Sequence, residues 1–361
     1  MNRRNPGDGC AHKQRGSTLL LVVVSLPAMV GMLGLASDLG RLYIVKNELQ
    51  AFVDSAALAA SYELDGTTQG LNNASTVAST GPVAGSVVNK WDFSTKTVTN
   101  VQSSFAQTFD GTYLPNPGTA SGYRFVRVTV TAQVPLYFLG ILPGVSGTQN
   151  VSATAVAGQG SETSVGEGGA PFSPDAHDPA DPSFGFTLGQ KYTLKWAPPG
   201  QRSKPGGSCP ADVGFTPGGG SSDRGYIDVG QGNGNSALHD AIVNNDYNLA
   251  EPLTVGSLID MVPGNKHVGP AVDERFNQDT DTSSSTYSTY NGNGRRLLVA
   301  PVNDGGDPAR VVGFAGFFLP PDACGNNNKP CCAEYVGPVL LSGKRKAAAT
   351  TTGLYKVKLF R

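Results

Sequence analysis

The feature that most constrains this chain is an apolar run near its N-terminus. Residues 19–36, LLLVVVSLPAMVGMLGLA, contain no charged side chain. As a helix they would extend about 27 Å at roughly 1.5 Å per residue, close to the thickness of the hydrocarbon core of a bilayer. The run therefore predicts a single transmembrane helix, anchored by Leu19, Leu20, Leu21, Val22, Val23, Val24, Pro27, Leu33 and Leu35.

The charges that precede the run predict its orientation. Arg3, Arg4, Lys13 and Arg15 stand against a single acidic residue, Asp8. Positive residues concentrate on the cytoplasmic side of membrane helices. We therefore expect residues 1–16 to form a cytoplasmic tail, the span to lie in the inner (cytoplasmic) membrane, and the bulk of the chain to be extracytoplasmic.

Two other interpretations of the N-terminus remain open. In a cleaved secretory signal, the small residues around Leu35 in Gly34-Leu35-Ala36 would mark the cleavage site. The apolar core of such a signal is about 7–15 residues long, however, and this run is longer. A prepilin cut after Gly16 would normally carry Glu at the fifth mature position, which is Leu21 here.

Beyond the run, the sequence predicts that the same helix continues into water. No Gly or Pro occurs between Arg41 and Leu64, and Asp65-Gly66 then provides a stop. Apolar residues recur at steps of three and four, as on one face of a helix, interrupted only by Lys46. The small residues at the far end allow another backbone to approach closely. We expect residues 17–64 to pack against the following domain through Leu39, Leu42, Leu49, Val53, Ala56 and Ala60.

This segment resembles the N-terminal region of the TadG-like Tad (tight adherence) or Flp pilus-assembly proteins. The elements that carry the resemblance are Arg15-Gly16, Pro27, Asp38-Leu39-Gly40-Arg41, Leu49-Gln50 and Asp54-Ser55-Ala56-Ala57-Leu58-Ala59-Ala60. Phe52-Val53 departs from the small or polar residues that are usual before Asp54. The resemblance implies a membrane-anchored protein that acts in assembly of a Flp-type pilus or in surface adhesion, with other pilus-assembly proteins as partners and self-association as a further possibility. The alternative is a secreted or released β-rich binding protein whose N-terminus is a cleaved signal.

A second part of the resemblance spans residues 123–158. Residues 125–131 alternate as a strand does, and a second strand is expected near residues 150–157. Tad pilus-assembly proteins are similar here, with a strand, an apolar loop and an Ala-rich strand. The apolar patch at residues 136–142 is too short to cross a membrane. We interpret it as part of the core, with a loop that touches the membrane surface as the alternative.

The remainder of the chain predicts a linker and a second domain. Residues 161–182 are rich in Gly, Ser, Pro and acids and are expected to be a linker between an α+β domain at 65–160 and a mainly β domain at 183–361. Short strand candidates include 192–196, 296–302, 311–319 and a closing strand at 354–360, and helices are expected at 235–245 and 255–261. The predicted fold class is therefore α+β. The C-terminal half resembles an uncharacterised module found attached to Tad-type anchors.

The five cysteines divide by compartment. Cys10 would be cytoplasmic and reduced, whereas Cys209, Cys324, Cys331 and Cys332 would lie outside, where disulfides persist. Neighbouring cysteines rarely bridge to each other. We therefore expect Cys209 to pair with one of the other three and the remaining two to pair together, with a zinc site as the rival interpretation.

Few motifs in the sequence indicate a catalytic, metal-binding or nucleic-acid-binding site. The net charge is −1 without a long basic block, which argues against a nucleic-acid partner. Asp281-Thr-Ser-Ser-Ser matches the metal motif of von Willebrand A domains but lacks the apolar strand before it, and Asp175, Asp178 and Asp181 form at most a weak calcium pattern. Ser236, His239 and Asp240 lack a nucleophile elbow. We expect no enzyme activity, no cofactor and no metal.

Overall fold

A computed structural model of the chain describes residues 15–81, 87–141, 144–220, 222–230, 232, 234–244, 249, 251–341 and 346–360. The cytoplasmic tail expected at residues 1–16, with Cys10 and most of the basic cluster, lies almost entirely outside these residues. The chain divides into two compact units, Met1–Val53 with Val83–Val101 and Thr129–Thr154, and Asp54–Pro82 with Gln102–Val128 and Ala155–Arg361. We call them unit 1 and unit 2 and describe each by itself.

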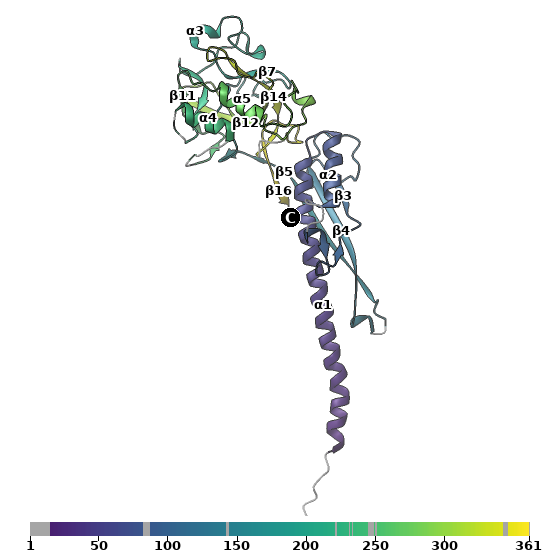
Figure 1. Cartoon of the computed structure of the whole chain (residues 1–361). Helices are drawn as coiled ribbons and strands as arrows, with labels where there is room; N and C mark the ends of the chain where they lie inside the picture. The colour runs from purple at the N-terminus through teal and green to yellow at the C-terminus, as the bar shows by residue number, and fades with distance from the viewer. Residues whose placement is uncertain are drawn as a thin grey trace, which may run out of the picture. The chain divides into compact units, whose positions relative to one another are not determined.

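The described residues form a mixed α+β fold, as the sequence predicts (Figure 1). The helices are α1 (Arg15–Glu63), α2 (Thr68–Thr80), α3 (Pro199–Arg202), α4 (Asn235–Asn244) and α5 (Gly269–Asn277), with 3-10 turns η1 (Val87–Asn89), η2 (Leu139–Ile141), η3 (Pro210–Asp212) and η4 (Tyr287–Thr289). The strands are β1 (Lys90–Trp91), β2 (Lys96–Thr97), β3 (Gln102–Ala106), β4 (Phe125–Pro135), β5 (Thr148–Glu162), β6 (Ser164–Val165), β7 (Lys191–Lys195), β8 (Asp223–Ile227), β9 (Leu253–Thr254), β10 (Leu258–Ile259), β11 (Met261–Pro263), β12 (Leu297–Asn303), β13 (Ala309–Phe318), β14 (Cys331–Gly337), β15 (Val339–Leu340) and β16 (Leu354–Phe360).

Helix α1 is continuous for 49 residues, with Pro27 inside it. This confirms the prediction that the apolar run and the segment after it form one helix. Among the described residues, it is the one helix long and apolar enough to cross a membrane. Leu19 to Leu21 are each about 70% exposed, because no other part of the chain that the structure describes covers them.

A five-stranded sheet has the strand order β15-β16-β5-β4-β3. The last strand of the chain, β16, pairs antiparallel with β5 from Leu354 opposite Glu162 to Phe360 opposite Val156. This sheet extends across the domain boundary expected at residue 160. Strand β5 continues to Glu162, and the C-terminal strand β16 pairs with β5 in the same sheet. Lys356 and Lys358 alternate along β16, as the sequence predicts for an edge or closing strand.

The C-terminal part of unit 2 is rich in β-structure, as the predicted fold class expects. A second five-stranded sheet has the order β10-β13-β14-β7, with β12 also paired to β13. Its core contains the buried rings of Phe172, Tyr226, Phe317 and Tyr335. Helix α4 matches the helix predicted at 235–245, of which residue 245 lies outside the described residues. The helix predicted at 255–261 is wrong, because this segment forms β10 and β11, which pair with β13 and β8.

The segment expected as a linker, residues 161–182, packs as part of unit 2. It contains strand β6, paired with β9, and the fully buried side chain of Phe172. Ser173 and Asp175 are buried as well, and the amide of Asn303 donates to the carbonyl of Ser173 at 2.9 Å. Composition favoured a linker here, but a few apolar side chains and polar groups that find partners are enough to fix the segment in the core.

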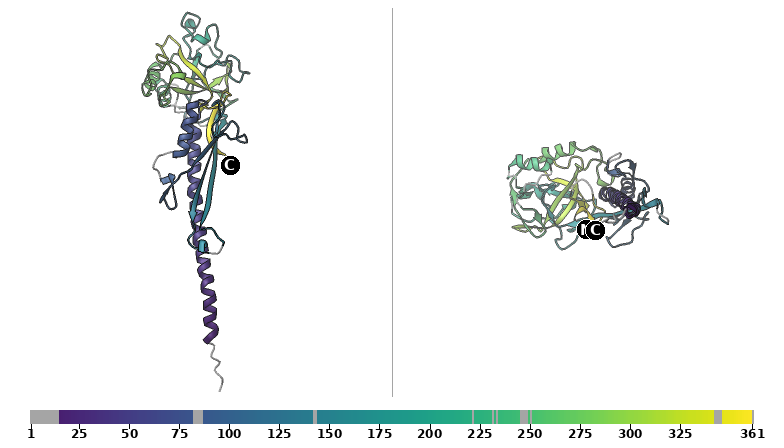
Figure 2. Two further views of the ribbon diagram at one scale, coloured as in Figure 1. Left: turned by 90° about the vertical axis from the view of Figure 1, so that its right-hand side faces the viewer. Right: turned by 90° about the horizontal axis from the view of Figure 1, so that it is seen from below.

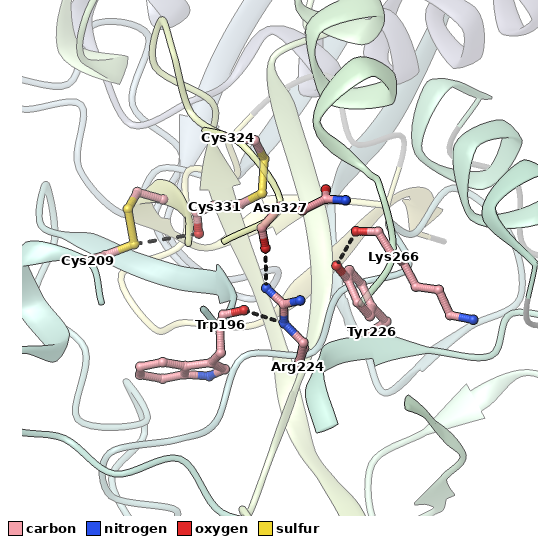
Figure 3. Close-up of a disulfide and its surroundings, with 9 residues drawn as sticks. Trp196, Cys209, Arg224, Tyr226, Lys266, Cys324, Asn327 and Cys331 are labelled. Atoms are coloured by element: carbon pink, nitrogen blue, oxygen red, sulfur yellow. Dashed lines mark hydrogen bonds between the residues drawn. A yellow bond between two sulfur atoms is a disulfide. The ribbon is translucent and has the colours of Figure 1, made fainter. Parts of the chain in front are cut away.

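Two disulfides join the four cysteines expected to be extracytoplasmic. Cys209 pairs with Cys332 and Cys324 with Cys331, in agreement with the pairing rule applied to the sequence. Nearby, Arg224 is buried and its guanidinium donates to the carbonyls of Trp196 at 2.7 Å and Asn327 at 2.8 Å (Figure 3). Arg224 therefore connects strand β8 to the short loop that the Cys324–Cys331 disulfide closes.

Candidate functional site at the β4–β5 turn

The first element of the site is Asp38 on α1, which binds the turn between β4 and β5. We define the β4–β5 turn as residues 136–141 and 144–147; residues 142 and 143 lie outside the described residues. The carboxylate of Asp38 accepts hydrogen bonds from the backbone N–H groups of Tyr137, Phe138 and Leu139 at 3.1, 3.0 and 2.7 Å. These N–H groups lie at the start of the 3-10 turn η2, where backbone donors have no partner within the turn. Asp38 is only 2% exposed.

The second element is a close contact between α1 and the ring of Phe138. Gly34 lies one helical turn before Asp38 and is buried. A Cβ atom added to Gly34 would lie 2.5 Å from the Cβ of Phe138, closer than carbon atoms approach. Gly34 is therefore required for the turn to reach the helix. Gly31 and Gly40, on the same helix, have open space at the corresponding position.

The third element is Arg41, which holds two other segments of unit 1. Its guanidinium forms a two-pronged pair with Asp92, with Nε–Oδ1 at 2.9 Å and Nη2–Oδ2 at 2.6 Å. The remaining Nη1 donates to the carbonyl of Pro135 at 2.6 Å, and the guanidinium carbon lies 4.6 Å from the ring centre of Tyr137. Arg41 therefore connects the helix to the end of β4 and to the turn after β1. Figure 2 shows the region where these segments run beside α1.

Asp92 occupies a backbone conformation that suits this role. Asp92, Phe93 and Ser94 have φ of 57°, 57° and 62°, in the left-handed region that residues with side chains rarely adopt. The carbonyl of Asp92 accepts from the Thr95 hydroxyl at 2.6 Å, and Lys96 lies 3.2 Å from its carboxylate. The turn therefore presents a nearly buried carboxylate to Arg41.

The charges of the site are stabilised within it. Burial alone raises the pKa of Asp38, but the N–H groups of Leu139, Phe138 and Tyr137 and the charge of Arg41 lower the pKa by more, so that the net shift is downward. The hydrogen bond from Arg41 is the main cause that lowers the pKa of Asp92. Both carboxylates are therefore ionised at neutral pH. We call Asp38, Arg41 and Asp92 the clamp.

The packing residues expected on α1 differ along its length. Leu39 is 52% exposed and Leu42 is partly buried, so the face that packs near the apolar run passes through Gly34 and Asp38 instead. Farther along, a set of positions is fully buried, namely Val45, Leu49, Val53, Ala56, Ala57 and Ala60.

The end of the helix in unit 2 is held by a buried amide. The Nε2 of Gln159, on β5, donates to the carbonyls of Ser61 at 2.9 Å and Leu64 at 2.6 Å. Its Oε1 accepts from the N–H of Ala348 at 2.8 Å. Gln159 is fully buried and satisfies the last carbonyls of α1, which have no partner within the helix.

The other motifs form no reactive arrangement among the described residues. Asp281 accepts hydrogen bonds from the N–H and hydroxyl groups of Ser283 and Ser284, so it stabilises its own loop. His239 contacts Asp240 at 3.3 Å and Glu274 at 3.2 Å, and Ser236 is exposed. No group of three or more His, Cys, Asp or Glu side chains gathers as a metal site in the part of the chain that the structure describes, and this includes the acids of residues 175–181.

The comparisons with known families place this site within two matched regions. Residues 16–65 match a family model described as putative Flp pilus-assembly TadE/G-like. Residues 50–157 match a second model, described as putative Tad-like Flp pilus-assembly. The N-terminal and middle regions are therefore similar to the Tad domains of pilus-assembly proteins. No curated protein and no solved structure matches the chain.

The clamp joins these two matched regions. Asp38 and Arg41 belong to the first, whereas Asp92, Pro135 and Tyr137 belong to the second. Asp38-Leu39-Gly40-Arg41 is one of the elements that carry the resemblance to the Tad family, but its sequence alone predicts no structural role for it. The sequence signal for such a role is the pair of opposite charges, Asp38 and Arg41, directly after the charge-free run. An unpaired charge at that position would be costly, so each charge is expected to have a partner.

Proposed function

We propose that this protein is a membrane-anchored, non-enzymatic component of Flp-type pilus assembly, with its N-terminus in the cytoplasm and the bulk of the chain outside the inner membrane. The observation that carries the proposal is the clamp, which fastens an apolar helix to an outer domain through residues of both Tad regions. A flexible tether would not need a buried carboxylate and a two-pronged arginine at this point. The outer domains would then act as a scaffold or binding module for other assembly proteins.

The contact at Gly34 also supports an anchor that is retained. Cleavage after Ala36 would remove Gly34 and with it the surface that Phe138 covers. A secreted protein with a cleaved signal would leave this side chain without its partner. N-terminal sequencing of the mature protein from its native cells separates the two: a start upstream of Arg15 supports the anchor, and a start at Ser37 or Asp38 supports the secreted form.

The assembly role is tested in cells that build the pilus. The variant Asp38→Asn/Arg41→Met removes two of the three clamp charges and leaves Asp92 without its main partner. The control, Asn47→Ala, changes an exposed position of the same helix. We expect the clamp variant to remain in the membrane fraction at a normal level while surface pili, counted by electron microscopy, decrease. Equal pilus numbers in the clamp variant, the control and the native protein would contradict the role assigned to the clamp.

A further inference from the structure

We propose that the β4–β5 turn is a second membrane-contacting element, which lies in the interfacial layer of the same bilayer that holds residues 19–36. The proposal rests on the membrane anchor proposed above. Its ligand is a lipid surface, and the residues that contact it are Tyr137, Phe138 and Val145. The turn would add a second point of attachment to the single helix and so restrict how the helix tilts relative to the membrane.

The position of Phe138 along α1 carries the first step. Phe138 lies directly over Gly34, which is two residues inside the charge-free run, or about 3 Å from its end at roughly 1.5 Å per residue. The run is just long enough to cross the hydrocarbon core, so it has little room to shift along the membrane normal. A bilayer that holds the run therefore extends to the level of Phe138.

The exposure of the turn carries the second step. Tyr137 is 61% exposed, Phe138 45% and Val145 41%. The expectation that this patch belongs to the core is therefore wrong for Tyr137 and Phe138, and the alternative, a loop that touches the membrane surface, accounts for them. Aromatic side chains concentrate at the level of the lipid headgroups, where an apolar ring and a polar tip both find a suitable medium.

The charge of the turn carries the third step. The sequence contains no Asp, Glu, Lys or Arg between Arg127 and Glu162, so the whole hairpin tip is uncharged. Two charged side chains of the clamp, Asp38 and Arg41, contact the turn. Asp38 is covered by three N–H groups and Arg41 is paired with Asp92. The clamp therefore holds the turn to the helix without presenting an uncompensated charge to the lipid.

Phe93, also in unit 1, is an exposed aromatic residue that we expect to lie in water, so it serves as a control for Phe138. Phe93 is 60% exposed, and its N–H donates to Glu48 at 3.2 Å. Glu48 lies twelve residues beyond Ala36, about 18 Å farther along the helix at roughly 1.5 Å per residue. This exceeds the headgroup layer, which adds about 5–8 Å on each side of the hydrocarbon core. Asp92, next to Phe93, pairs with Arg41 about 8 Å beyond Ala36, so Phe93 lies between these two levels and farther from the apolar run than Phe138.

The test uses the full chain reconstituted into phosphatidylcholine vesicles. Phe138→Trp and Phe93→Trp are compared with the unsubstituted protein, which contains Trp91 and Trp196 in all three samples. The added fluorescence is measured in lipids brominated near the headgroup and in unbrominated lipids. We expect quenching by the brominated lipid and a blue-shifted emission for the Phe138→Trp variant, as for an interfacial ring, and neither effect for Phe93→Trp.

The outcomes separate this proposal from the anchor. If the protein floats with the vesicles but the tryptophan at 138 behaves like that at 93, the turn does not contact lipid, and the anchor stands without it. If the protein does not float with the vesicles, the anchor fails and the lipid contact fails with it. Shielding of position 138 in native membranes but not in pure lipid vesicles would assign the turn to a protein partner and overturn the lipid contact.

Discussion

Arg41 and Asp92, 51 residues apart in the sequence, form a two-pronged ion pair in which neither side chain is more than 12% exposed. Arginine presents two parallel N–H groups to a carboxylate, whereas lysine presents a single ammonium. The third contact of Arg41, to the carbonyl of Pro135, uses the remaining branch of the guanidinium. The geometry therefore requires arginine at this position.

The first prediction concerns this pair. Arg41→Met leaves the carboxylate of Asp92 without its main partner, and we expect unit 1 to lose about 2–4 kcal/mol of stability, since removing one member of a shielded pair is costly. Arg41→Lys should lose a smaller part of this. Lys96→Met is the control, because Lys96 also contacts Asp92 but its side chain is 41% exposed, and surface pairs contribute less than about 1 kcal/mol. Thermal unfolding in detergent measures all three, and equal losses for Arg41→Met and Lys96→Met would contradict the prediction.

The second prediction concerns pH. The pKa values of Asp38 and Asp92 are lower in the folded protein than their usual value of 3.8. The clamp therefore contributes its full stability above about pH 4, and this contribution is lost as the pH falls through the lower folded values. We expect the emission of a tryptophan at position 138 to change below about pH 4 as the turn detaches.

The variant Asp38→Asn tests the assignment. An amide does not titrate, so the part of the pH response that comes from Asp38 should disappear, while the turn is held less firmly at every pH. An identical acid transition in the native protein and in Asp38→Asn would assign the response to other groups.

The third prediction concerns the two glycines of the apolar run. Gly34→Ala places a Cβ 2.5 Å from the Cβ of Phe138, so the turn must move away from the helix. Gly31→Ala meets nothing within 4 Å and is the matched control. Both variants are expected to remain in the membrane fraction, because alanine is as apolar and a better helix former. Protease cleavage at the β4–β5 turn should increase for Gly34→Ala and stay at the native level for Gly31→Ala.

The contrast between Gly34 and Leu39 shows how far the sequence predicts the site. The absence of charge from 19 to 36 and of Gly or Pro from 42 to 63 is sufficient to predict the long helix. The periodicity assigns the packing face next to the apolar run to leucines, because it counts apolar side chains and gives no weight to a glycine or an aspartate. The structure buries Gly34 and Asp38 there, because the turn supplies three backbone N–H groups and a ring to cover them.

The contacts of Gly34 and Asp38 could not be predicted from the sequence, because their partners are distant along the chain. The residues that bind Asp38 lie 99 to 101 positions farther along the chain. No local pattern reports a contact of that range. The same limit applies to β16, whose alternation predicts a strand but not that it pairs with β5 of the other predicted domain.

The fourth prediction concerns the small residues of α1 in unit 2. Ala56 and Ala60 are fully buried, so Ala56→Leu/Ala60→Leu overpacks the interface of the helix and should cost about 1–3 kcal/mol for each residue. Ala51→Leu adds the same atoms at an exposed position of the helix and is expected to change stability by less than about 0.5 kcal/mol. We expect pilus assembly to weaken in the double variant while the protein stays in the membrane. Unchanged assembly would remove the packing role from these positions.

The fifth prediction concerns Lys195, at the end of β7. Its side chain is fully buried, and its ammonium nitrogen has no hydrogen-bond partner in the described structure. Burial, together with the nearby charge of Arg224, lowers its pKa from 10.5 to about 8. The charged form is penalised in the folded state, so the cost is fully present below pH 8. It is relieved as the pH rises from 8 towards 10.5, and over that range the stability contributed by this group increases with pH.

Replacement of Lys195 by methionine keeps the aliphatic stem and removes the unpaired ammonium. We expect Lys195→Met to stabilise the protein by about 1–3 kcal/mol at pH 7, the cost of a buried polar group without a partner, and to remove the rise in stability between pH 8 and 10.5. Lys356→Met, at an exposed position of β16, is the control and should leave both features unchanged. Urea unfolding at several pH values, followed by tryptophan fluorescence, measures both effects. A destabilised Lys195→Met variant at pH 7 would mean that the ammonium has a favourable partner in the folded protein, and the assignment of an unpaired buried charge would then be wrong.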